Sequence, residues 1–167
     1  MTVKPMNHNY RRRTNGTSLT GGKEMGYVYA DIELTNEEDV ALSRRGYLPE
    51  NQIKRVTTRA LVDSGAYDLI INQEVQDQLH LRVLGKRPIK LADETIVEVD
   101  IVGPVEVRFE TRATTVRALV IPDTEEVLLG AIPLEGLDVI IDPLRERMFV
   151  NPPETTNAKV KQVSLSI

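Results

Sequence analysis

Asp63 is the residue of this 167-residue chain whose setting best fits a catalytic role. It follows the apolar run Ala60-Leu61-Val62 and precedes Ser64 and Gly65, so a strand is predicted to end on a carboxylate held in a turn. If a second Asp63 lay about 3 Å away across a two-fold axis, the two groups could not both ionise and would share one proton. One carboxylate would then activate a water while the other protonated the carbonyl oxygen under attack.

The same three residues are also ordinary turn chemistry, because an Asp side chain readily bonds the backbone two residues further on. A purely structural role for Asp63 is therefore open on the motif alone. Other catalytic groups are harder to find: Cys is absent, and no serine stands in a Gly-x-Ser-x-Gly setting. His8 and His80 are isolated, so neither a metal nor a cofactor is expected.

The composition is that of an ordinary globular domain, with 41% hydrophobic and 28% charged residues. Aromatic residues are only 4% and Trp is absent, so Val, Leu and Ile must build the core, which favours strands. A net charge of −4 gives no general attraction to nucleic acid or to anionic membranes, and no apolar run approaches the roughly 18 residues needed to span a bilayer. The lack of Cys fits a reducing compartment, and the cytoplasm is the predicted location.

Short strands separated by turn signals fill most of the chain from residue 27 onward. Asn72 is placed to cap a short helix ending near Leu79, and a second short helix is expected over 132–137. The polar stretch 35–52 predicts a loop with one helical turn, and Gly103-Pro104 is expected to separate two strands. The pattern predicts an all-β barrel or sandwich, with strands at 27–34, 53–62, 88–91, 95–102, 105–109, 114–121, 138–142 and 147–150.

A short sequence pattern occurs twice in the chain, once on each side of the central strands. Two apolar residues run into a Gly-containing turn at Leu61–Gly65, and they do so again at Leu128-Leu129-Gly130. A short helix is expected soon after each copy. The two copies lie on either side of the hairpin region, and that arrangement makes the repeated pattern informative.

These residues resemble a known family. Leu61-Val62-Asp63-Ser64-Gly65-Ala66 is similar to the signature of the retropepsin-like aspartic proteases, and Leu128-Leu129-Gly130 is similar to their second motif. Leu91-Ala92-Asp93-Glu94-Thr95 lies between the two, where the family carries its flap hairpin. The resemblance spans about residues 27–150, and it is nearest to the bacterial branch, often called clan AA.

The resemblance implies a closed β-barrel with one or two short helices that works as a homodimer, with Asp63 of each subunit as the catalytic residue. The implied activity is aspartic endopeptidase cleavage of a peptide or protein substrate. The remaining implied site residues are the active-site loop Ser64, Gly65 and Ala66, the substrate-binding or flap residues Asp68, Leu91, Ala92, Asp93 and Glu94, and the second motif Leu128, Leu129 and Gly130.

Two departures from the family pattern keep alternatives open. Viral members carry an Arg and then an Asn or Asp after the second Gly, where this chain has Ala131 and Ile132. The flap tip also lacks the glycines that make viral flaps pliable. Both departures favour a second hypothesis, a non-catalytic dimeric module that binds peptides by β-augmentation. A third is a structural barrel in which Asp63 only caps a turn.

The predicted domain organisation has three parts. Residues 1–24 are expected to be a disordered tail, because they are polar and lack an apolar cluster. Residues 25–150 form the predicted protease-like domain. Residues 151–167 are expected to form a C-terminal tail or a strand of the dimer interface.

Overall fold

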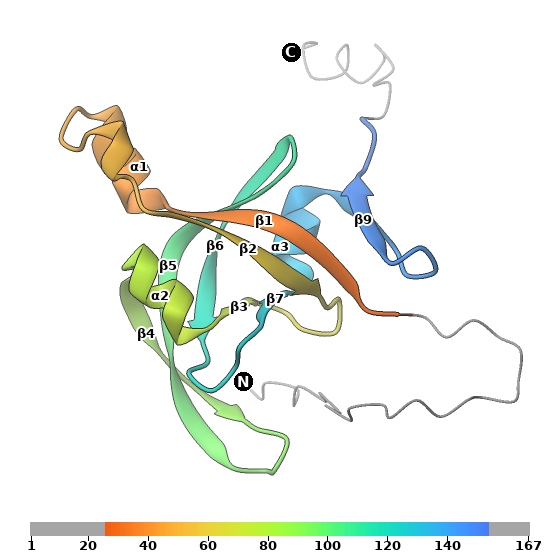
Figure 1. The fold of residues 1–167 in the computed structure, drawn as a ribbon. Coiled ribbons are helices and arrows are strands. Elements are labelled where there is room, and N and C mark those ends of the chain that lie inside the picture. Colours follow the sequence, from red (N-terminus) through yellow and green to blue (C-terminus); the bar gives the residue numbers. More distant parts are fainter. Residues whose placement is uncertain (1–25, 154–167) are drawn as a thin grey trace, which may run out of the picture.

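The computed structural model describes residues 26–153 (Figure 1). The predicted N-terminal tail, 1–24, and almost all of the C-terminal stretch, from residue 154 onward, lie outside the described residues. Within 26–153 the chain forms nine strands, three α-helices and one 3-10 turn. None of these helices is both long and apolar enough to cross a lipid bilayer.

Six strands close into a barrel, which confirms the predicted all-β architecture. The ring closes because β1 pairs antiparallel with β2 on one side and with β5 on the other. The intervening order is β2, β7, β3, β6 and β5, and β2 runs parallel to β7. The strand bounds are β1 (Val28–Asn36), β2 (Arg55–Val62), β3 (Leu69–Ile71), β5 (Ile96–Phe109), β6 (Arg112–Val120) and β7 (Val127–Leu129).

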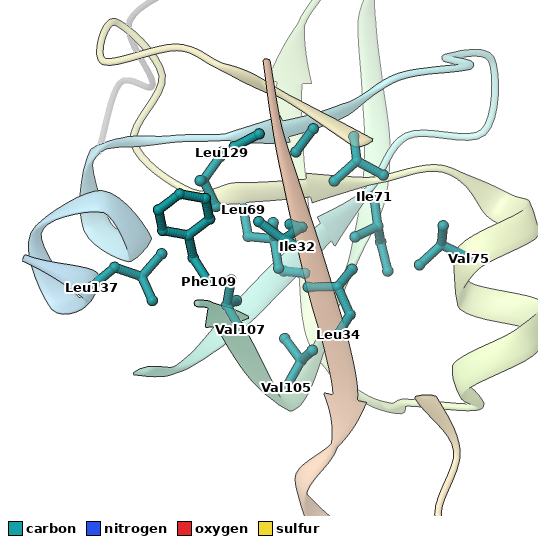
Figure 2. Packing of buried hydrophobic residues seen from close by; sticks show 14 of the residues in the cluster. Ile32, Leu34, Leu69, Ile71, Val75, Val105, Val107, Phe109, Leu129 and Leu137 are labelled. Atoms are coloured by element: carbon teal, nitrogen blue, oxygen red, sulfur yellow. The ribbon is translucent and has the colours of Figure 1, made fainter. Parts of the chain in front are cut away.

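Aliphatic side chains fill the barrel, as the scarcity of aromatics predicted (Figure 2). On β1 the alternate residues Ile32 and Leu34 point inward and are almost fully buried. They pack with Leu129 from β7 and Ile71 from β3, so the ends of the two short strands meet inside the core. This is the period-2 alternation of a half-buried strand. The core therefore holds β7, which leads into Gly130, and β3, which follows the Asp63 loop.

The strand β4 (Arg82–Lys90) forms a hairpin with the first half of β5, and this hairpin extends beyond the barrel (Figure 1). β4 starts six residues before the predicted strand at 88. The earlier part was not predicted because an exposed edge strand rich in charge shows little alternation of apolar and polar residues. The prediction that Gly103-Pro104 separates two strands was wrong. β5 continues through this point, pairing with β6 as Val102↔Ala118 and then Val105↔Val116, so β5 holds one extra residue there. This irregularity is a β-bulge. Because of the extra residue, the alternation of inward-facing and outward-facing side chains along β5 is shifted by one position beyond it.

The polar stretch predicted as a loop with one helical turn contains the eight-residue helix α1 (Glu37–Arg44) and the 3-10 turn η1 (Glu50–Gln52). The Asn36 side chain caps α1 by accepting a hydrogen bond from the Asp39 N–H at 3.2 Å. Three acidic residues in the first turn favour the helix further through its dipole. α1 brings the helix count above the predicted one or two.

The other two helices occupy the predicted places. α2 (Gln73–Leu79) begins at Asn72, whose side chain accepts from the Val75 N–H at 2.9 Å, as predicted. α3 (Ala131–Leu137) follows Gly130 directly. A separate two-stranded sheet, β8 (Val139–Asp142) and β9 (Arg147–Val150), matches the predicted final hairpin.

Candidate active site

Asp63 lies at the end of β2 in a loop that backbone hydrogen bonds define. Its N–H donates to the Leu129 carbonyl at 3.0 Å, and its own carbonyl accepts from the Ala66 N–H at 3.1 Å. The carboxylate atom Oδ1 accepts from the Gly65 N–H at 2.9 Å. Asp63 is half-buried, whereas Ser64 and Gly65 are exposed. The loop therefore presents one carboxylate oxygen to its own backbone and lies open on its outer side.

The second glycine motif supports this loop directly. Val62 on β2 pairs with Leu129 on β7, so the two motifs lie side by side at the ends of parallel strands. Beyond Gly130, the Ala131 N–H donates to the Ala66 carbonyl at 2.7 Å and the Ile132 N–H to the Tyr67 carbonyl at 2.9 Å. The structure thus brings together the two sequence motifs that bracket the central hairpins.

Gly130 is required by this close approach. A Cβ at this position would lie 2.4 Å from the Asp68 carbonyl oxygen and 2.9 Å from that of Ala66. Both atoms belong to the backbone, so no rotamer change could relieve the contact. The backbone angle φ of Gly130 is −84°, an ordinary value. Space, and not backbone conformation, excludes other residues here.

A cavity of about 820 Å³ opens beside the loop. Its floor is formed by Ile70, Leu119 and Leu128, which belong to a second apolar cluster on the outer side of the barrel. The β4–β5 hairpin provides one wall, with Ile89 and Val99. The cavity is large enough for side chains of an extended peptide, and most of its lining is apolar.

Residues 121–126 form the rest of the wall, and the sequence did not indicate them. They join β6 to β7 and carry Asp123, Glu125 and Glu126, so this rim is acidic. Tyr29 on β1 donates its phenol to Glu126 Oε1 at 3.1 Å. Burial, followed by that hydrogen bond, raises the pKa of Tyr29 above its ordinary value. No local motif marks these residues, because barrel closure alone brings them to the cavity.

The predicted flap residues form the tip of the β4–β5 hairpin. Leu91 and Ala92 line the cavity, and Asp93 and Glu94 lie at the exposed turn. The Leu91 N–H donates to the Thr95 carbonyl at 2.8 Å and the Glu94 N–H to the Leu91 carbonyl at 3.0 Å. Asp93 accepts through Oδ1 from both the hydroxyl and the N–H of Thr95. The tip is thus closed by its own hydrogen bonds.

The Thr95 hydroxyl, followed by the Thr95 N–H, holds the pKa of Asp93 below its ordinary value. The stabilising contribution of a carboxylate with a lowered pKa is present above the ordinary pKa and is lost as pH falls through the lowered one. We expect Thr95→Val to raise the pKa of Asp93 toward its ordinary value in an NMR titration. Asp142 gives an internal control, because Arg145 chiefly lowers its pKa. An unchanged Asp93 titration, or an equal shift of Asp142, would contradict this origin.

Asp68 lines the cavity, near where the resemblance places a bound peptide backbone. Its side chain is only 9% exposed and is engaged by cations from two strands. Arg87 Nη1 on β4 donates to Oδ2 at 3.0 Å, and Arg117 Nε on β6 lies 3.8 Å from Oδ1. Neither arginine was singled out from the sequence.

Within residues 26–153, no cluster of three or more His, Asp or Glu side chains has the arrangement of a metal site. In comparisons with known proteins, a family model described as gag-polyprotein putative aspartyl protease matches residues 50–135. The match runs from η1 into α3, so it includes the Asp63 loop, the hairpin and Gly130. A search of curated proteins found no match.

Proposed function

Because the chain belongs to the gag-polyprotein aspartyl protease family, a retropepsin-like family, we propose that it is an aspartic endopeptidase acting as a homodimer. The observation that carries the proposal is the position of Asp63, fixed by the backbone of both glycine motifs beside an apolar cavity. In the proposed reaction one carboxylate takes a proton from the attacking water and the other gives a proton to the scissile carbonyl oxygen.

A second copy of the chain is part of the proposal, because each subunit has one such loop and the mechanism needs two carboxylates. The faces beside the loop suit an apolar contact. Tyr67 is 57% exposed and Ile132 48% exposed, and the two are adjacent through the Ile132 N–H bond to the Tyr67 carbonyl. In viral members of the family, polar residues follow the second Gly. We propose that this apolar pair takes over their part in the subunit contact.

Ile132→Glu should weaken the dimer by about 30-fold or more, equivalent to roughly 2 kcal/mol, because it places a charge in an apolar contact. Sedimentation velocity over a concentration series measures the effect. Ile132 is already half-exposed, so the fold of the single chain should be kept. Leu42→Glu on α1 is the matched control, since Leu42 is 44% exposed and lies far from the loop in sequence and on another element. Equal dimer stability in both variants would place the interface elsewhere.

The direct test of the proposed activity is incubation of the purified protein with a complex peptide mixture at several pH values, followed by mass spectrometry of new termini. Cleavage is expected to be strongest below neutral pH, where the pair retains its single proton. It should fall more steeply than protein concentration on dilution, because only the dimer would hold both carboxylates. A statine-type inhibitor, whose hydroxyl stands in for the attacking water, should block it.

A non-catalytic peptide-binding module is the second candidate function. The acidic hairpin tip favours it, because the tip holds no glycine and is closed by its own hydrogen bonds. A tip that moves little would hold an extended peptide without enclosing the attacking water. Peptide binding without new termini at any pH, unchanged by Asp63→Asn, would favour this function. For either function the cytoplasm is the proposed location, because a chain without Cys forms no disulfides and fits a reducing compartment.

A further inference from the structure

We infer that Asp68 and Arg87 anchor the β4–β5 hairpin to the loop that carries Asp63, and that both are positioning residues for substrate. This inference rests on the proposed function for its catalytic consequence. The anchor itself rests on the arrangement of three elements around one buried carboxylate.

The Asp68 end of the anchor is rigid. Asp68 comes five residues after Asp63 and directly before β3, whose three residues are all buried. Its backbone is packed so closely against Gly130 that no Cβ fits between them. The neighbouring Tyr67 carbonyl is bonded to the Ile132 N–H. The carboxylate therefore projects from the most constrained part of the site.

The Arg87 end lies on an element that needs support. Among the described strands β4 pairs only with β5, so it is the edge of the sheet and has no strand on its other side. Arg87 pairs with Val99 partway along the hairpin, and Ile89, Leu91 and Ala92 beyond it line the cavity. The angle of the hairpin sets how far these side chains stand above the cavity floor.

Other ion pairs of the hairpin cannot set this angle. Lys86 with Glu98 and Lys90 with Glu94 both lie within the hairpin and are largely exposed. Arg82 reaches Glu38 on α1, but Arg82 is the first residue of β4, at the root of the hairpin. The pair of Arg87 with Asp68 is different, because it leaves the hairpin, joins the active-site loop and is well shielded, with side chains 23% and 9% exposed.

Arg117 strengthens the arrangement from a third element. Its Nε lies 3.8 Å from Asp68 Oδ1, while Arg87 occupies the other oxygen. Two cations from different strands therefore contact one shielded carboxylate, and such charge-assisted contacts are stronger than neutral hydrogen bonds. Loss of Arg87 would leave Asp68 paired with Arg117. The loop would then keep one ion pair, while the hairpin would lose its ion pair to the loop. Arg87 is therefore the residue whose removal isolates the effect on the hairpin.

The test uses the full chain with Arg87→Met, Arg87→Lys, Asp68→Asn and the control Lys86→Met, which removes an exposed ion pair from the adjacent position of the same strand. Hydrogen exchange of the folded protein gives the first readout. In Arg87→Met and Asp68→Asn, amides at residues 91–97 should exchange roughly tenfold faster, while those of β1 and β2 stay unchanged. Lys86→Met should match the wild type, and Arg87→Lys should lie between, because Lys keeps the charge without the planar fork.

Peptide cleavage gives the second readout. Arg87→Met should lower kcat/KM by about 10- to 100-fold, with a rise in KM carrying most of the change, because the hairpin would still cover the cavity but at the wrong height. Unchanged exchange at 91–97 in both Arg87→Met and Asp68→Asn would overturn the anchor. Faster exchange throughout the barrel would also overturn it, since the pair would then be a general stabiliser. If the wild type cleaves nothing, the proposed function fails, but the exchange experiment still decides the anchor.

Discussion

Asp63→Asn is expected to abolish peptide cleavage while leaving the fold and the dimer intact. The loss should be at least about 10²- to 10⁴-fold, the usual contribution of general acid–base catalysis, because an amide can neither take the proton of the water nor share one with its partner. The loop should survive, since the amide oxygen of Asn can still accept from the Gly65 N–H where Asp63 Oδ1 now accepts at 2.9 Å. Mass spectrometry of cleavage products and sedimentation velocity measure the two halves of this result.

Asp77→Asn is the matched control, because Asp77 is a carboxylate on the exposed side of α2, bonded to the Gln73 side chain. It undergoes the same chemical change outside the site. Full activity in Asp63→Asn would refute the proposed mechanism. Loss of the dimer in Asp63→Asn would instead give Asp63 a structural role, and the activity result would then have to be repeated at a concentration that restores the dimer.

Gly130→Ala should be the most damaging small substitution in the described part of the chain. The added methyl group would overlap backbone atoms of Ala66, Tyr67 and Asp68, at 2.9, 2.8 and 2.4 Å, and backbone cannot rotate away. We expect a loss of about 1–3 kcal/mol or more in the free energy of unfolding, measured by denaturant titration. Activity should fall further than stability alone explains, because the displaced segment leads directly to Asp63.

Gly85→Ala is the control for this experiment. A Cβ at Gly85 would meet no atom within 4 Å, and this glycine also lies in a strand. Its substitution should leave the free energy of unfolding nearly unchanged. Equal effects at the two positions would show that the loop has room to move away from β7, and that the packing around Gly130 is looser than the distances indicate.

The parts of the site that could be predicted were those with a local cause. Two turns were indicated by the apolar run into Asp63-Ser64-Gly65 and by the similar run into Gly130. In the structure these turns lie side by side at the ends of parallel strands. Asn72 was recognisable as a helix cap because the cap acts within three residues. The family match over 50–135 confirms the resemblance that these motifs suggested.

The missed features depend on contacts between distant segments or on weak local patterns. The first helix was predicted only as a single turn, because its residues are polar and its cap, Asn36, belongs to the preceding strand. Arg87 and Arg117 were missed because each is one charge among several on its strand. Their convergence on Asp68 exists only after β4, β6 and the loop are brought together, 19 and 49 residues from Asp68 in sequence. Residues 121–126 were missed for the same reason.

The bulge in β5 limits where residues can be inserted into or deleted from this chain without misplacing buried side chains. Before it, Val99 and Ile101 pack in the second apolar cluster, outside the barrel, and after it Val105 and Val107 belong to the barrel core. Deleting one residue at Gly103-Pro104 would restore a simple alternation and turn one of these two sets toward the wrong side. Residues gained or lost at the turn 91–95 would leave both sets in place. Natural variants with a longer or shorter cleft are therefore expected to differ at that turn, and those altered in the middle of β5 are expected to fail to fold.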